Sequence, residues 1–216
     1  MNSRDNVSPG LDVINTDSQI GANVDIADAQ RDVRTVFVGG FAGQLIASGV
    51  WFLSAALATW RSPRIAIPVL VIVGAFIFPL TQLLLRLMGR STALLKGHPM
   101  NDLGRQVAFT LPLNLPLVAA ATLHHLNWFY PALMVALGTH YLPFMFLYGM
   151  WQFGMLAASL IAAGVVIGLY LPSVFSIGGW FTALVLLIFA FVGRTVAIRD
   201  SKAFSTDRPV PPTQTN

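Results

Sequence analysis

The chain has 216 residues, of which 55% are hydrophobic and only 10% are charged. Soluble domains carry about 25% charged residues, so this composition excludes a soluble globular protein. The high hydrophobicity and the net charge of only +4 exclude disorder over most of the chain. The sequence has no cysteine, which excludes disulfides, thiolate metal sites and cysteine nucleophiles. We therefore expect an all-α, polytopic integral membrane protein.

The first segments of the chain are polar. Residues 1–22 are expected to form a disordered tail, and they show no signal-peptide pattern. Residues 23–34 mix apolar and charged side chains, and Asp28 stands three positions before Arg31, a spacing that stabilises a helix slightly. We predict an interfacial helix over 23–34 that leads into the first membrane span.

Six apolar runs are long enough to cross a bilayer, which takes about 20 residues in a helix. No Asp, Glu, Lys or Arg occurs between Arg105 and Arg194, so four spans joined by short turns fit there. We predict a six-transmembrane-helix bundle, followed by a basic disordered tail at 195–216. The predicted spans are 35–59, 65–85, 106–124, 128–148, 151–171 and 174–193.

The boundary between the fourth and fifth spans has two candidate positions. The stretch from Thr139 to Pro143 carries a helix-break signal, because the residue before a proline avoids the helical conformation and proline lacks a backbone donor. The stretch from Gly149 to Gln152 is the other candidate, and we favour it. Either choice leaves six spans.

Lysine and arginine are distributed unevenly between the two sides of the predicted bundle. Of the 13 Lys and Arg residues, only Arg61 and Arg64 lie on the side opposite the termini. Loops rich in Lys and Arg face the cytoplasm. We therefore expect a multi-pass protein of the plasma or inner membrane with both termini in the cytoplasm. Its basic tail would also attract anionic membrane lipids, although we interpret this charge mainly as a determinant of topology.

Small residues recur every four positions on three spans. They are Gly39, Gly43 and Ala47 on the first span, Gly164 and Gly168 on the fifth, and Gly179 and Ala183 on the sixth. This spacing lets helix backbones approach closely in lipid, where apolar surface alone does not drive helices together. We favour packing within the chain, and a homodimer formed through one of these faces is the alternative.

Four polar side chains fall at about the same depth when each span is counted from its inner end at 1.5 Å per residue. They are Gln44, Asn114, His140 and Ser159. An unpaired amide or imidazole in hydrocarbon is costly, so we expect these groups to meet one another or water inside the bundle. Prolines near Asn114 and His140 free backbone carbonyls, as happens where membrane helices line a binding site. A hydrogen-bonded cross-link is favoured over a solute or proton site.

The sequence offers little for catalysis or for a cofactor. A serine nucleophile has no orienting carboxylate in the predicted spans. His124 and His140 would lie at depths about 18 Å apart, too far for shared haem ligation, and no carboxylate or cysteine joins them in a zinc site. There is no phosphate-binding loop. We expect no enzymatic activity, no metal, no cofactor and no nucleic-acid partner.

Several short motifs resemble an uncharacterised family of small bacterial membrane proteins. They are the run from Ala29 to Arg34, the glycines at 39, 40 and 43, the sequence Leu103-Gly104-Arg105, and the run from His140 to Phe144. The resemblance covers residues 28–194. It implies a six-helix integral membrane protein, and it carries over no catalytic or binding residue.

Two functions remain open on this basis. The first is a structural or regulatory membrane component that acts through its helix faces or its cytoplasmic segments. The alternative is a small channel or transporter for an uncharged solute, with a polar site near His140. Ion coupling commonly uses intramembrane Asp or Glu, which the predicted spans lack. A water-filled cavity beside His140 would favour the alternative, and a dry bundle would favour the first.

Overall fold

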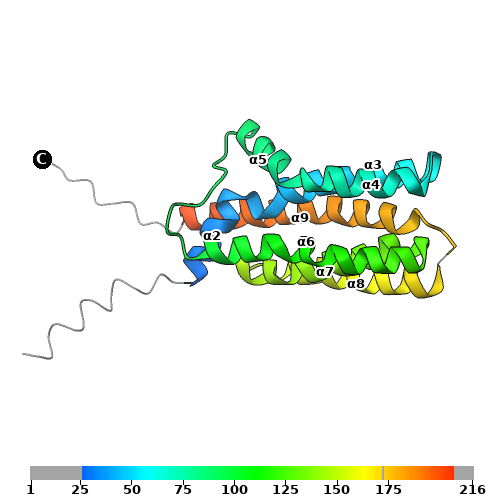
Figure 1. Cartoon of the computed structure of the whole chain (residues 1–216). Helices are drawn as coiled ribbons and strands as arrows, with labels where there is room; N and C mark the ends of the chain where they lie inside the picture. Colours follow the sequence, from blue (N-terminus) through cyan, green and yellow to red (C-terminus); the bar gives the residue numbers. More distant parts are fainter. Residues whose placement is uncertain (1–25, 172, 207–216) are drawn as a thin grey trace, which may run out of the picture.

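The computed structural model describes residues 26–171 and 173–206, and within these ranges the chain is helical without a β-strand (Figure 1). The tail predicted at 1–22 lies outside the described residues. The elements are α2 (Ile26–Val36), η1 (Val38–Gly40), α3 (Phe41–Trp60), α4 (Pro63–Ala75), α5 (Ile77–Leu87), α6 (Met100–His124), η2 (Leu126–Trp128), α7 (Phe129–Tyr148), α8 (Gln152–Tyr170) and α9 (Ile177–Thr206).

The prediction of an all-α bundle of apolar helices is confirmed. Among the described residues, α3, α6, α7, α8 and α9 are each long and apolar enough to cross a membrane. Helices α4 and α5 pass the same test only as a pair, and together they make a sixth span if the bent pair crosses as one. The long helices run side by side, and the turns alternate between the two ends of the bundle (Figure 1).

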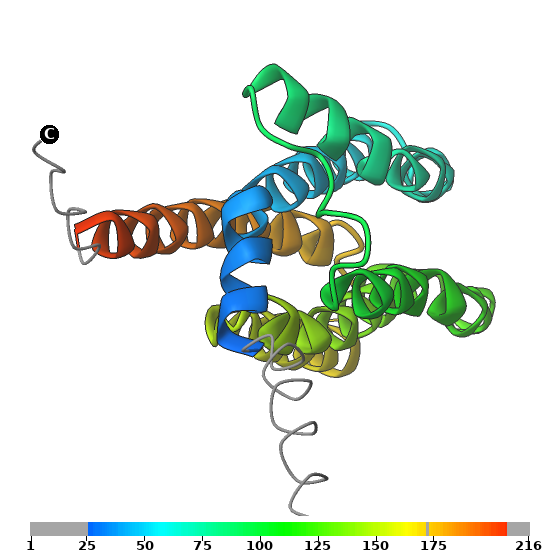
Figure 2. The ribbon, with the colours of Figure 1, turned by 90° about the vertical axis from the view of Figure 1, so that its left-hand side faces the viewer.

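The helices form two groups. In the first, α3 packs against α9 and α4, with α5 attached to α3; in the second, α7 packs against α8 and α6. Contacts between α8 and α9 join the groups along their length. At the joint, the fully buried core includes Tyr130, Met134, Leu156, Leu160 and Leu186. A further connection is made by α2, which crosses one end of the bundle (Figure 2). We call this end the α2 end.

The chain turns sharply between α2 and the first span because of three residues with left-handed backbone angles. Val38, Gly39 and Gly40 have φ values of 51°, 62° and 81°. Glycine adopts this conformation without strain, whereas a β-branched valine rarely does. The turn lays α2 across the bundle instead of extending α3, and the buried side of α2 carries Ala29 and Val33. The span predicted at 35–59 therefore begins only at η1.

The span predicted at 65–85 is not one straight helix. Its two parts, α4 and α5, are bent by 54° at Phe76. Pro79 explains the position of the bend, because its ring nitrogen has no hydrogen to donate to the carbonyl of Ala75. It is tolerated in the first turn of α5, where no such donor is needed. The bend turns α5 out of line with α4 at the α2 end (Figure 1), and α5 keeps its contact with α3.

Helix α7 passes through Pro143 without a break and ends at Tyr148, where Gly149 has φ 60°. The turn before α8 therefore lies at 149–151. Packing explains why α7 continues. Gly138 lets α7 approach α8 so closely that an added Cβ would lie 2.9 Å from the backbone oxygen of Ala157. Membrane helices tolerate proline where neighbouring groups satisfy the freed backbone.

The last helix continues beyond the predicted end of the sixth span. Helix α9 reaches Thr206, so the prediction of a disordered tail at 195–216 is wrong for 195–206; residues 207–216 lie outside the described part of the chain. A tertiary contact accompanies this extension, since Asp200 forms an ion pair with Arg34 of α2 at 3.4 Å.

We predict that Gly193→Ala destabilises the protein. A Cβ on Gly193 would lie 2.5 Å from the carbonyl oxygen of Gly39, so the backbones of η1 and α9 would have to separate. Overpacking of this kind costs about 1–3 kcal/mol, which should appear as a lower melting temperature in detergent. The matched control is Gly49→Ala on α3, where an added Cβ meets nothing within 4 Å. Equal stability of the two variants would contradict the close approach.

Candidate functional site

His140 is tied to the neighbouring helix by one short hydrogen bond. Its Nδ1 lies 2.6 Å from Oγ1 of Thr110 on α6. The same hydroxyl lies 2.8 Å from the carbonyl of Val107. One hydroxyl proton serves one acceptor, so when Thr110 donates to Val107, the Nδ1–H of His140 donates to Thr110. The pair is a cross-link between α6 and α7.

The four polar side chains predicted to share one layer do not come together. Asn114 donates to the carbonyl of Thr110 at 2.7 Å and so lies near His140. Ser159 is partly buried and donates to the carbonyl of Met155 in its own helix. Equal depth does not imply contact, because the direction of a side chain depends on how its helix is rotated in the bundle.

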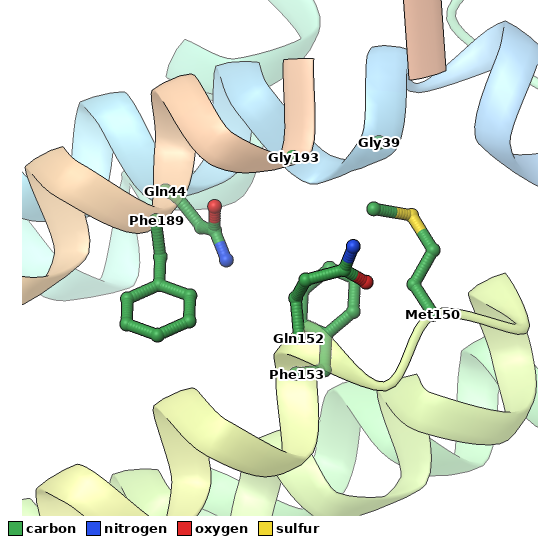
Figure 3. A pocket seen from close by; sticks show the side chains of 7 residues that line it. All are labelled: Gly39, Gln44, Met150, Gln152, Phe153, Phe189 and Gly193. Atoms are coloured by element: carbon green, nitrogen blue, oxygen red, sulfur yellow. The ribbon is translucent and has the colours of Figure 1, made fainter. Parts of the chain in front are cut away.

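Gln44 lies in a separate cleft at the joint between the two groups of helices (Figure 3). The cleft has no room for a water molecule, and it is lined by Gly39, Gln44, Met150, Gln152, Phe153, Phe189 and Gly193. The Gln44 side chain, on α3, is 4% exposed, and its Oε1 has no hydrogen-bond partner. The same holds for Oε1 of Gln152 at the start of α8. Figure 3 shows both amides reaching into the space between α9 and α8.

Two unpartnered amide oxygens in one narrow cleft are unusual. Buried polar groups in proteins are hydrogen-bonded in the large majority of cases, and each unpaired group costs about 1–3 kcal/mol. The cleft is therefore a place where the bundle leaves hydrogen-bonding capacity unused; another among the described residues is Oγ1 of the fully buried Thr182. Chemically, Gln44 and Gln152 offer neutral acceptors and donors, which suit a polar uncharged molecule rather than acid–base catalysis.

The small-residue faces make contacts within the chain. Gly39 lies against Gly193, and Gly164 and Gly168 lie against Pro131 of α7. Gly43 faces Thr81 of α5 across ordinary van der Waals distance. Ala47 is buried in the core. These positions let α3, α8 and their neighbours pack closely, as the spacing indicates.

The α2 end carries the most directed polar contacts between elements far apart in sequence. Nη1 of Arg34 donates to the carbonyls of Tyr148 at 2.8 Å and Gly149 at 3.3 Å. Nε2 of Gln30 donates to the carbonyl of Phe146 at 2.6 Å. These carbonyls belong to the C-terminal end of α7 and its cap, where helical partners run out, although that of Phe146 also accepts from the backbone N–H of Gly149. A cation and an amide from α2 therefore help to cap α7. Asp200 of α9 completes the set.

Sequence reasoning missed Arg34, Gln30, Thr110 and Gln152. Arg34 counted only toward topology, because its partners are backbone carbonyls that no sequence pattern marks. Gln152 stands at the predicted turn before the fifth span. Its polar amide, inside the long stretch without charged residues between Arg105 and Arg194, was an available signal of a polar site. Thr110 resembled the many hydroxyl residues that bond to their own helix, as Thr81 and Thr122 do.

Comparison with known proteins gives one match. Residues 26–195 match the model of a family of unknown function, DUF7010. The chain belongs to this family. The expectation of an uncharacterised family is thereby confirmed, and membership assigns no activity. No curated protein matches the chain, and no solved structure matches it.

We predict that Gln44→Leu stabilises the protein. Leucine keeps most of the volume and removes an amide whose oxygen has no partner, a change worth up to about 1–3 kcal/mol. The melting temperature in detergent should rise. The matched variant Asn114→Leu removes a side chain that is hydrogen-bonded, so this variant should not raise the melting temperature. A lower melting temperature for Gln44→Leu would show that the amide is satisfied in the native protein.

Proposed function

We propose that the protein is a structural or regulatory component of the cell membrane, without enzymatic activity, that acts through a cytoplasmic α2 end. In this proposal both termini are cytoplasmic and membrane lipids are its surroundings and partners. The docking of α2 across the bundle carries the proposal, because it joins one segment outside the spans to both groups of helices.

The way α2 is held suits a regulatory role. Its buried contacts are small, Ala29 and Val33, and the rest of its attachment consists of polar contacts made by Gln30 and Arg34. Polar contacts near an aqueous surface exchange readily with water or with a partner's charged groups. A docked helix of this kind is an element with two states, which a charge change or a partner can bias.

A second function has a specific observation in its favour. The cleft of Gln44 and Gln152 lies at the joint between the helix groups, with unused hydrogen-bonding capacity. A channel or transporter for a small uncharged solute would use such a place as its closed constriction. In this second function the polar site is the cleft and not His140, because Nδ1 of His140 is already hydrogen-bonded to Thr110.

We predict that Arg34 keeps α2 docked. Because the chain has no cysteine, a Val33→Cys variant carries a single thiol at a position that is 1% exposed. A membrane-impermeant maleimide should label it slowly, and adding Arg34→Gln should raise the labelling rate severalfold. The control is Arg105→Gln, which breaks only an exposed pair with Asp102.

Inside-out and right-side-out vesicles test the orientation in the same experiment. In the Arg34→Gln background, labelling should occur in inside-out vesicles and not in right-side-out ones. Labelling confined to right-side-out vesicles would overturn the cytoplasmic assignment. An equal, fast rate with and without Arg34 would overturn the docking role.

We predict that the protein does not raise membrane permeability to small neutral solutes. Liposomes with the reconstituted full chain should swell in glycerol or urea at the rate of protein-free liposomes, because the cleft has no room for even a water molecule. Swelling that is severalfold faster, and that Gln44→Leu abolishes, would replace the first function by the second. The Ser159→Ala variant, whose hydroxyl bonds only within its own helix and away from the cleft, is the matched control.

A further inference from the structure

Helix α5 packs on α3 by one side and exposes an apolar surface on the other. Among its residues only Leu85 is buried, where it packs with Phe41 and Ala190. Phe78 and Leu87, by contrast, are 69% and 76% exposed. Apolar side chains this exposed on a helix beside a membrane bundle are suited to contact with acyl chains.

The lengths of the two half-helices place the end of α5 near the membrane surface. At 1.5 Å per residue, the 13 residues of α4 span about 20 Å. The 11 residues of α5 span about 16 Å, of which about 10 Å lie along the direction of α4 after a 54° bend. Together they match a hydrocarbon core of about 30 Å. The C-terminal end of α5 therefore reaches headgroup level, where Leu85 packs on the bundle and its neighbours Arg86 and Leu87 are exposed.

Three cations follow at that level. Arg86, Arg90 and Lys96 are all exposed, and none of them makes an ion pair with a described residue. Of the other basic residues near the α2 end, Arg34 and Arg105 pair with aspartates and Arg194 lies over the ring of Phe41. Arg199, by contrast, is exposed and, like Arg86, Arg90 and Lys96, makes no ion pair with a described residue. Basic residues that only set the orientation of the protein in the membrane need no particular position within a loop. Here Arg86 lies in the last turn of α5, Arg90 follows three residues after the helix ends, and Lys96 lies further along the same loop.

We propose that the end of α5 and the loop after it bind the headgroups of anionic phospholipids. In this site Arg86, Arg90 and Lys96 hold the phosphate, and the exposed side chains of α5 contact the acyl chains. Guanidinium groups match phosphate oxygens with two parallel hydrogen bonds. The proposal does not depend on the function proposed above, and it stands whether or not α2 moves or a solute crosses.

The test uses a fluorophore on Leu87→Cys, the single thiol of the chain. The full-length protein is placed in vesicles of phosphatidylcholine and phosphatidylglycerol, one of which carries a nitroxide quencher on its acyl chain. Quenching by each lipid gives the local preference of the anionic lipid at position 87. We expect a clear preference for phosphatidylglycerol, and a preference near one for the same label on Leu123→Cys, an exposed position of α6 at the opposite end.

Charge variants separate a site from a general effect of charge. Arg86→Gln, Arg90→Gln and Lys96→Gln should each reduce the preference by up to about fivefold, which corresponds to about 1 kcal/mol per cation near a charged surface. The double variant Arg61→Gln/Arg64→Gln, which removes cations at the far end, should not change it. The proposal would be overturned if the parent protein showed no preference for phosphatidylglycerol. It would also be overturned if Arg86→Gln, Arg90→Gln and Lys96→Gln all left that preference unchanged. All of these residues are exposed, and a melting curve for each variant verifies folding.

Discussion

The close approach of two backbones at Gly39 and Gly193 fixes the arrangement of the α2 end. With no side chain on either residue, η1 and α9 meet at backbone distance, and this contact sets where α3 begins and where α9 passes. The left-handed turn at Val38 sets the direction of α2. Because α9 passes close to this turn, its Asp200 can form the ion pair with Arg34 of α2. In lipid, where apolar surface gives no net drive between helices, such close packing supplies much of the stability.

Polar groups then decide which helices stay together. Most hydroxyls in the described spans bond to a carbonyl of their own helix, which satisfies them but joins nothing. The exceptions join elements. Tyr130 of α7 lies 2.6 Å from Ser54 of α3, and Ser54 also bonds to the carbonyl of Ala66 on α4. At the α2 end, Arg34 joins α2 to the carbonyl of Tyr148 on α7 and to Asp200 on α9. The two groups of helices are thus held by directed polar contacts near both ends.

Between these two connections lies the cleft with Gln44 and Gln152, whose amide oxygens lack partners. Proteins depart from full hydrogen-bond satisfaction mainly at places of functional importance. The position of the cleft is consistent with either proposed function. If α2 regulates the bundle, the cleft is where the helix groups would first separate; if a solute crosses, it is where the solute would be held.

The sequence by itself determined the membrane class, the apolar spans and the packing role of the small residues, because hydrophobic length and glycine spacing are local properties. Only the tertiary structure decided that α7 continues through Pro143, that the second span bends at Phe76, and that Gln44, Asn114, His140 and Ser159 separate. A proline weakens the helix at both Pro79 and Pro143, and packing on neighbouring helices decides whether the helix bends there. Depth along a span is readable from residue counts, whereas the rotation of each helix, which decides what a polar side chain meets, exists only in the assembled bundle.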